Sequence, residues 1–274
     1  MGEAMIAGVI RMHLASGEAL ITAGPRLERL EQLQEQYGVQ VTLDNAEAAA
    51  QADVVILSVK PQRLDKVLLG LRGSIQPGAL VLSIVAGASI KKIGSGLHHQ
   101  IIVRSMPNTP AQIGEGITVW TASHDVSDEQ REMTRQILAA LGQEIFVEEE
   151  TYLDMATALS GTGPAYVFLF MEAMVDAGVH LGFPRRIAEQ LVAQTVRGSV
   201  DYFTRRDDPV HLARLRNEVT SPGGTTATAL YYLEKAGFRT AISRAVWAAY
   251  ERSIELGRGG KIHAPDQTSG SDGS

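Results

Sequence analysis

The 274-residue sequence contains no cysteine, which excludes disulfide bonds and thiolate metal sites. Its seven histidines show no spacing typical of a metal centre, so we expect no metal. The net charge is −6 and aromatic residues make up only 5% of the chain, so a basic, aromatic-rich nucleic-acid surface is not expected. These absences fit a protein of the reducing cytoplasm that binds no nucleic acid.

Long hydrophobic runs are also missing, because each apolar stretch is shorter than a bilayer-spanning helix requires. The N-terminus lacks a basic region followed by a long apolar run, so we expect neither a signal peptide nor a membrane partner. Residues 259–274 are rich in Ser, Gly and Asp and predict a disordered tail. Function is therefore expected in residues 1–258.

Two patterns divide these residues. From Ala19 to Val147, short β-branched runs alternate with helical segments, which predicts a parallel, doubly wound α/β sheet in a domain at 1–150. Beyond Glu150 the strand signals end, and residues 151–258 predict an all-helical domain. We expect strands at Ala19–Thr22, Val39–Leu43, Val54–Val59, Leu80–Val85, Ile101–Met106, Ile117–Trp120 and Glu144–Val147.

Several helices have recognisable ends in the sequence. We expect a first helix from Gly2 that stops at Gly17 and a second between Pro25 and Gly38. Ser127 and Gln130 predict a capping box at the start of a third. The later segment 159–182 is apolar nearly all round, which predicts a buried helix, and a subunit interface is one place that would bury it.

Small or polar turns follow three consecutive predicted strands. They contain Lys60-Pro61-Gln62, Ala86-Gly87 and Pro107-Asn108-Thr109-Pro110. Ligands of open α/β sheets bind at the carboxyl ends of strands, so these turns are suited to a nucleotide crevice. The alternative, that they are ordinary connections of an α/β fold, stays open at this point.

The segment VTSPGGTTATAL, residues 219–230, predicts a second site. Pro222-Gly223-Gly224 breaks the chain just before a helix, whose first N–H groups are suited to a carboxylate or phosphate. A simple N-cap is the alternative. Ser160–Tyr166 is a similar small-residue turn, with functional and packing roles equally open. Because no acid, base or nucleophile is evident, we expect a cofactor to carry the difficult step.

Together these segments resemble pyrroline-5-carboxylate reductases, the enzymes of the last step of proline biosynthesis. The resemblance is carried by MGEAMIAG, VVILSVKPQ, RSMPNTPAQIGEG, TALSGTGPAYVFLFMEA, VTSPGGTTATALYYLE and GFRTAISRAVWAAYERSIELG, and it covers residues 1–257. It implies a Rossmann-like N-terminal domain that binds NADPH or NADH and an all-α dimerisation domain. It also implies a homodimer, which in this family often assembles further into rings.

The resemblance further implies roles for particular residues. NAD(P)H would reduce 1-pyrroline-5-carboxylate, a cyclic imine, to L-proline. Ser221 and the backbone N–H groups of Gly224, Thr225 and Thr226 would bind the substrate carboxylate, and the Thr226 hydroxyl would hydrogen-bond the ring nitrogen as the catalytic group. The cofactor would contact Gly2, Asn45, Ser58, Val59, Lys60, Pro61, Ile84, Val85, Ala86, Met106 and Asn108.

The cofactor preference has one clue in the sequence itself. Enzymes that select NAD usually carry Asp or Glu after the second strand of the dinucleotide fold. In this chain Ala23-Gly24-Pro25-Arg26 follows the corresponding run, without a carboxylate. Arg26 could face a 2′-phosphate, so we predict a preference for NADPH.

Two alternatives remain. A β-hydroxyacid dehydrogenase would use a lysine on the interdomain helix, but Ser160–Gly182 contains none. A non-enzymatic dimerising protein is the other, because MGEAMIAG resembles only the tail of a strand–Gly-x-Gly-x-Met-Gly–helix unit. Gly2 corresponds to its last glycine, so we expect the first strand and two glycines of the family pattern before Met1.

Overall fold

The computed structural model describes residues 1–257, which form two compact units. The first unit comprises Met1–Thr162 together with the segment that begins at Ala248, and the second comprises Gly163–Trp247. The domain ranges expected from the sequence, with a boundary after residue 150, stay a prediction. The expected disordered tail at 259–274 lies outside the described residues.

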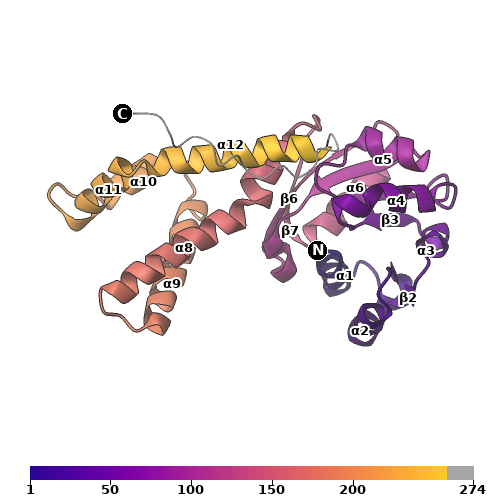
Figure 1. Cartoon of the computed structure of the whole chain (residues 1–274), viewed down its shortest axis with the longest axis horizontal. Coiled ribbons are helices and arrows are strands. Elements are labelled where there is room, and N and C mark those ends of the chain that lie inside the picture. The colour runs from indigo at the N-terminus through magenta and orange to yellow at the C-terminus, as the bar shows by residue number, and fades with distance from the viewer. Residues whose placement is uncertain (258–274) are drawn as a thin grey trace, which may run out of the picture. The chain divides into compact units, whose positions relative to one another are not determined.

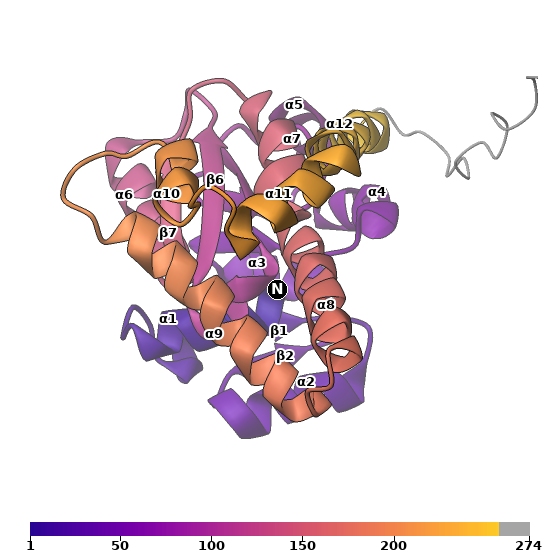
Figure 2. The ribbon, with the colours of Figure 1, turned by 90° about the vertical axis from the view of Figure 1, so that its left-hand side faces the viewer.

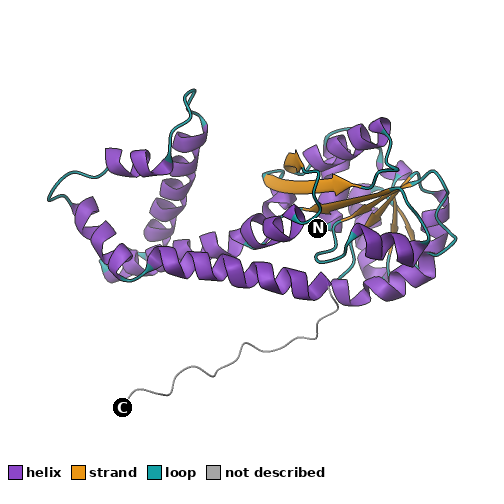
Figure 3. Ribbon diagram, turned by 90° about the horizontal axis from the view of Figure 1, so that it is seen from above, coloured by secondary structure: helices purple, strands orange, loops and turns teal. Residues whose placement is uncertain are grey.

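The first unit is built on seven strands in two sheets (Figure 3). One sheet pairs the first two strands in parallel, and the other has the order β3-β4-β5-β6-β7. All seven predicted strands are present, with shifted ends. The strands are β1 (Ile21–Ala23), β2 (Gln40–Thr42), β3 (Val54–Leu57), β4 (Leu80–Ser83), β5 (Ile102–Met106), β6 (Gly116–Ala122) and β7 (Gly142–Phe146).

The sheet is mostly parallel, and the expectation of a wholly parallel sheet is wrong at one ladder. Strand β6 runs antiparallel to β5, with Ser105 opposite Trp120, whereas the other ladders are parallel. The β5–β6 connection holds only a short 3₁₀ segment, η2 (Thr109–Ile113). A parallel return needs a crossover of about a dozen residues or more, usually a helix, so this short connection dictates reversal.

Strands β1 and β3 each have a ladder partner on one side only, within the described residues. Strand β1 pairs with β2, and β3 pairs with β4. The expectation of a further family strand concerns residues before Met1 and stays a prediction.

Helices cover both faces of the larger sheet (Figure 1). Leu64, Leu68 and Ile93 from one set of helices pack with Val81 of β4. Ala4, Met5, Leu138 and Leu141 pack with Leu82 from the other side. Strand β4 is buried along its whole length, as expected of a strand covered on both faces. The helices of this region are α1 (Gly2–Arg11), η1 (Gly17–Ala19), α2 (Leu27–Tyr37), α3 (Asn45–Gln51), α4 (Pro61–Leu71), α5 (Ile90–Leu97) and α6 (Asp128–Ala139).

Three of the predicted helix ends are confirmed, namely the start of α1 at Gly2, the end of α2 and the capping box of α6, and two are wrong. Helix α2 begins at Leu27 behind the N-cap Arg26, so Pro25 lies before the helix and does not open it. Gly38 ends α2 in the left-handed region with φ 67°, and Ser127 and Gln130 form both bonds of the capping box. The first helix, however, ends at Arg11, and Gly17 instead begins η1. His13 adopts a positive φ, and the N–H of Leu14 turns back to the carbonyl of Val9 (3.0 Å), which terminates the helix early.

The rest of the chain, up to residue 257, is helical, as expected beyond residue 150. In the second unit, α8 and α9 pack against each other near their connecting loop, around Val175, Ala188 and Val192 (Figures 1 and 2). The elements are α7 (Tyr152–Ala156), the π-helical turn η3 (Thr157–Gly161), α8 (Gly163–His180), α9 (Arg185–Thr204), α10 (Leu212–Glu218), α11 (Thr225–Lys235) and α12 (Phe238–Gly257).

Helix α8 is largely exposed within one chain, so the expected burial is left to a subunit interface and stays a prediction. Val175 is its only buried residue, while Phe168 and Leu169 are 62% and 65% exposed. By length and composition alone, Tyr152–His180 could span a membrane, with a mean hydropathy of 1.2 over a window that is 11% buried. Its uninterrupted apolar runs remain short, as the sequence indicates, and its exposed apolar surface needs a covering partner.

Candidate active site

The turns after β3, β4 and β5 lie at one edge of the sheet. The three strands are parallel neighbours, so their carboxyl ends meet. The turns begin at Ser58, Ile84 and Pro107, respectively. This edge therefore gathers most of the residues predicted to contact the cofactor.

The N-terminus of α1 lies against the turn after β3. A Cβ placed on Gly2 would lie 2.8 Å from Ser58 Oγ, so a larger residue would close this approach. Met1, at the N-cap, makes no side-chain capping bond. The first N–H groups of α1 and the Ser58 hydroxyl thus form a donor set suited to a phosphate.

The charged groups near the carboxyl end of β1 differ in their partners. Arg29 of α2 forms an ion pair with Glu3, whereas Arg26 has none among the described residues and is exposed. Tyr37 donates its hydroxyl proton to Glu3 Oε1 (3.3 Å). Partial burial, together with the negative charge of Glu3, raises the pKa of Tyr37. Of these two arginines, Arg26 is the one whose charge is available to an anionic ligand.

Asn45 and Lys60 both stand at helix starts. Asn45 is the first residue of α3, behind Asp44, whose Oδ1 accepts a hydrogen bond from Ala46 N (2.8 Å). Lys60 is the N-cap of α4 and is followed by Pro61 at the first helical position. Both Asn45 and Lys60 are exposed, so each is accessible to a ligand.

The turn after β4 is held at its start by backbone and hydroxyl contacts. Ile84 N donates to Leu57 O (3.1 Å), and Val85 N donates to Ser83 Oγ (3.2 Å). Val85 is 2% exposed, whereas Ile84 and Ala86 are half-buried. Ile84 and Ala86 are thus the more accessible pair of the predicted trio.

Met106 and Asn108, at the end of β5, have close protein neighbours. Asn108 Oδ1 accepts a hydrogen bond from Ile117 N (3.0 Å), so its amide oxygen also holds the start of β6. A Cβ placed on Gly161 would lie 2.8 Å from Met106 Cε. Gly161 ends the π-helical turn, a feature that often marks functional sites.

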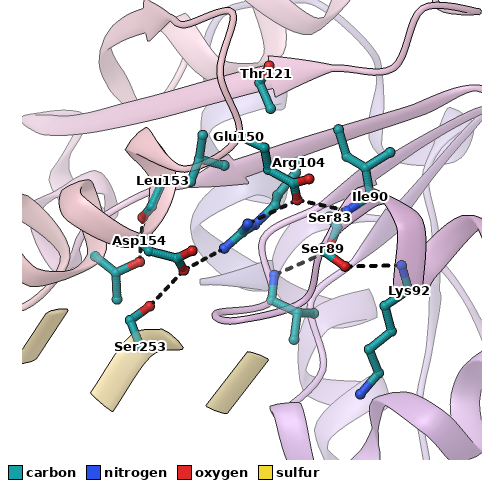
Figure 4. Close-up of polar contacts among 12 residues, drawn as sticks. Ser83, Ser89, Ile90, Lys92, Arg104, Thr121, Glu150, Leu153, Asp154 and Ser253 are labelled. Carbon is teal, nitrogen blue, oxygen red and sulfur yellow. Dashed lines mark hydrogen bonds and ion pairs between the residues drawn. The ribbon is translucent and has the colours of Figure 1, made fainter. Parts of the chain in front are cut away.

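The sequence interpretation missed an ion cluster behind this edge (Figure 4). Arg104 of β5 donates to Glu150 Oε1 and to Asp154 Oδ1, both at 3.0 Å. Ser253 of α12 donates to the same Asp154 oxygen (2.9 Å). An arginine inside the apolar run IIVRSM was the one signal available, since buried charges require partners.

The predicted substrate residues form a tight turn in the second unit. Gly223 has φ 73°, and Gly224 N donates to Ser221 O (3.0 Å). A Cβ on Gly224 would lie 2.5 Å from Ser221 Oγ, so any larger residue at this position would displace the hydroxyl. Helix α11 begins at Thr225 without a side-chain cap from Gly224. Ser221 and Thr225 are exposed and Thr226 is half-buried.

The structure brings Ser221, Gly224, Thr225 and Thr226 together in the second unit, and the predicted cofactor residues lie in the first. The turn contains the backbone N–H groups at the start of α11 and two hydroxyl groups, which are hydrogen-bond donors of the kind that bind a carboxylate. This arrangement is suited to an anion. A carboxylate bound there would complete a helix cap that the chain itself leaves open.

Comparisons with known proteins agree along the chain. Residues 150–256 match a family model described as pyrroline-5-carboxylate reductase dimerisation, and residues 1–87 match one described as NADP oxidoreductase coenzyme F420-dependent. Pyrroline-5-carboxylate reductase of Synechocystis is 43% identical over 94% of this chain and 95% of its own length. The Pseudomonas aeruginosa reductase is 37% identical over 92% of both chains.

Solved structures give the same result. The Plasmodium falciparum pyrroline carboxylate reductase with NADP bound has a TM-score of 0.85 and 33% identity, covering 94% of each chain. The Coxiella burnetii reductase has a TM-score of 0.83 and 34% identity over 95% of each. The resemblance, the Rossmann-like class and the helical dimerisation domain are thereby confirmed. This chain belongs to the pyrroline-5-carboxylate reductase family of oxidoreductases.

Proposed function

We propose that this chain reduces 1-pyrroline-5-carboxylate to L-proline, the last step of proline biosynthesis, with NADPH as the preferred cofactor and NADH as a substitute. The observation that carries the proposal is 43% identity to a reductase of that name over 94% of the chain. The family assignment favours this activity over a β-hydroxyacid dehydrogenase and over a non-enzymatic dimerising protein.

The cofactor residues fit the group they are assigned to. The approach at Gly2, which a Cβ would fill, and the uncapped start of α1 suit the pyrophosphate. Asn45, Ser58, Val59, Lys60 and Pro61 are assigned to its adenosine and phosphate region. Ile84, Val85, Ala86, Met106 and Asn108 are assigned to its nicotinamide side. When bound, the cofactor supplies hydride.

The substrate residues bind and orient the cyclic imine. Ser221 and the N–H groups of Gly224, Thr225 and Thr226 hold the carboxylate at the start of α11. The Thr226 hydroxyl hydrogen-bonds the ring nitrogen, which is more reactive at its neighbouring carbon when protonated. Because the substrate carries its own proton, positioning accounts for most of what the protein contributes.

Arg26 is assigned to the 2′-phosphate of NADPH. It is exposed at the end of β1 and forms no ion pair among residues 1–257, so its charge is available. Arg26→Ala should raise the KM for NADPH about tenfold, the effect of one lost charge-assisted hydrogen bond, while the KM for NADH stays within about twofold. Equal losses with both cofactors would refute this assignment.

The chain forms a homodimer through its helical domain, in line with the dimerisation model matched at 150–256. The exposed apolar surface of α8 supplies the contact, and a subunit rather than a lipid bilayer covers it. Further assembly into a ring of dimers and a cytoplasmic location belong to the same proposal.

A steady-state assay of NADPH oxidation with 1-pyrroline-5-carboxylate tests the activity. Ser221→Ala should mainly raise the KM for the imine, and Thr226→Ala should lower kcat. Each change is expected to be about tenfold, the value of one hydrogen bond to a charged group. Thr195→Ala is the matched control, because this helical hydroxyl of the same unit donates to Leu191 O (2.7 Å).

Three results would contradict the proposal. If Thr226→Ala left turnover unchanged while Ser221→Ala abolished it, the roles proposed for these two residues would be wrong. A wild-type chain that binds NADPH at micromolar concentration yet leaves the imine unreduced would refute the substrate. A chain that does not bind NADPH in a fluorescence titration would favour the non-enzymatic alternative.

A further inference from the structure

We propose that the ion cluster of Arg104, Glu150, Asp154 and Ser253, with the end of α12, positions the turn 84–90 for cofactor binding. This inference rests on the proposed function, because that turn carries the residues assigned to the nicotinamide side. The cluster residues act through the turn and are positioning residues.

The cluster is built around a buried cation. Arg104 lies on β5 opposite Ser83, the last residue of β4, and is 4% exposed. Both of its carboxylate partners come from the segment after β7, at 3.0 Å each. The guanidinium is buried while the Glu150 and Asp154 side chains are 31% and 21% exposed, so removing either carboxylate would leave part of a buried positive charge uncompensated. This cost holds both carboxylates against Arg104.

Glu150 also binds the carboxyl end of the turn 84–90. The same Oε1 that binds Arg104 accepts a hydrogen bond from Ile90 N at 2.8 Å (Figure 4). Ile90 is the first residue of α5, so the carboxylate also complements the positive end of the helix dipole. Ser89 adds a cap on Lys92 N (3.1 Å). The carboxyl end of the turn is thereby anchored.

Helix α12 anchors the middle of the turn. Ser253, 2% exposed, joins it to Asp154, and one turn later Gly257 packs on Gly87. A Cβ on Gly87 would lie 2.8 Å from Gly257 N, and one on Gly257 would lie 2.8 Å from Gly87 O. Gly87 has φ 70°, which also favours glycine. This backbone contact tolerates no side chain on either residue.

These contacts order the turn before cofactor arrives. If one contact is lost, only a fraction of the molecules holds the turn in its binding-competent form. The apparent Kd for NADPH then equals the intrinsic Kd divided by that fraction. At saturating NADPH the turn is restored, so kcat is preserved. A merely structural defect has the opposite signature, since a smaller folded fraction lowers kcat and leaves KM unchanged.

The test compares Glu150→Ala, Glu150→Gln and the control Glu132→Ala, which removes an ion-paired carboxylate on α6. Asp154 remains as the partner of Arg104 in each. We measure hydrogen exchange of the amides of 84–90 without cofactor, NADPH affinity by fluorescence, and KM and kcat. Glu150→Ala should speed exchange and raise both the Kd and the KM for NADPH about tenfold, with kcat within about twofold. Glu150→Gln keeps an acceptor for Ile90 N and should recover most of the loss.

A second pair of variants avoids charge. Gly257→Ala suits the helix but intrudes on Gly87 O, whereas Gly70→Ala in α4 meets open space. Only Gly257→Ala should weaken NADPH binding. Wild-type exchange and NADPH affinity in both Glu150→Ala and Gly257→Ala, or a loss of kcat at constant KM, would overturn the proposal. A wild-type chain inactive on the imine would refute the proposed function alone, because hydrogen exchange still decides whether the cluster orders the turn.

Discussion

Truncating Leu169 on α8 should weaken the homodimer and leave the fold intact. In one chain the side chain is 65% exposed on a helix within the region matched by the dimerisation model. Alanine has the highest helix propensity, so Leu169→Ala adds no strain to α8. The substitution should therefore reduce the free energy of dimer association and leave the free energy of folding of one chain unchanged.

The magnitude follows from the area that remains to be covered. Fully burying a leucine side chain is worth about 1.5–3 kcal/mol, so burying the exposed two thirds is worth about 1–2 kcal/mol. A two-fold interface uses the same patch on both subunits, which doubles the loss to about 2–4 kcal/mol. The dimer dissociation constant should then rise about 30-fold to 1,000-fold.

Sedimentation equilibrium over a dilution series measures this constant. Leu69→Ala is the matched control, because Leu69 on α4 is also 65% exposed but lies outside the matched region. Its dissociation constant should equal that of the wild type. The reasoning is refuted if Leu169→Ala dimerises as tightly as the wild type, or if both variants weaken the dimer equally.

Three further predictions concern the first unit. Ser127→Ala should lower the free energy of unfolding by about 1 kcal/mol through loss of the capping box, as measured by urea denaturation, and leave the KM for NADPH unchanged. Gly38→Ala should cost about 1–2 kcal/mol in the same assay because its φ is 67°, although no atom lies near the added methyl; a stabilising effect would contradict this. Glu3→Gln should lower the pKa of Tyr37, since it removes the negative charge that helps to raise it; an NMR titration assigned with Tyr37→Phe would show an unmoved pKa if burial alone were responsible.

The strands could be predicted because their signal is local. Apolar β-branched runs such as Val54–Leu57 and Leu80–Ser83 identify buried strands whatever their neighbours. The direction of β6 depends instead on the length of its connection to β5, which alternation of strands and helices does not report. The predicted end of α1 at Gly17 was also wrong, because the chain turns earlier, at the positive φ of His13.

The substrate turn was predictable as a motif, and its internal geometry was not. Pro222-Gly223-Gly224 before a helix indicates a break and a set of free N–H groups from sequence alone. The crowding of Ser221 Oγ against Gly224, however, depends on how the turn closes. The sequence therefore identified the donors, and the structure explains why the residue between the hydroxyl and the helix is glycine.

The ion cluster shows where inference from one sequence ends. Arg104 could be recognised as unusual, because a charged side chain within a buried strand must be paired. Its partners lie 46 and 50 residues further along the chain, and Ser253 lies another 99 residues beyond Asp154. No local pattern selects these among the 31 acidic residues. Since the cluster reaches Ile90 through Glu150, the accuracy of the proposed cofactor site depends on residues that a search for motifs passes over.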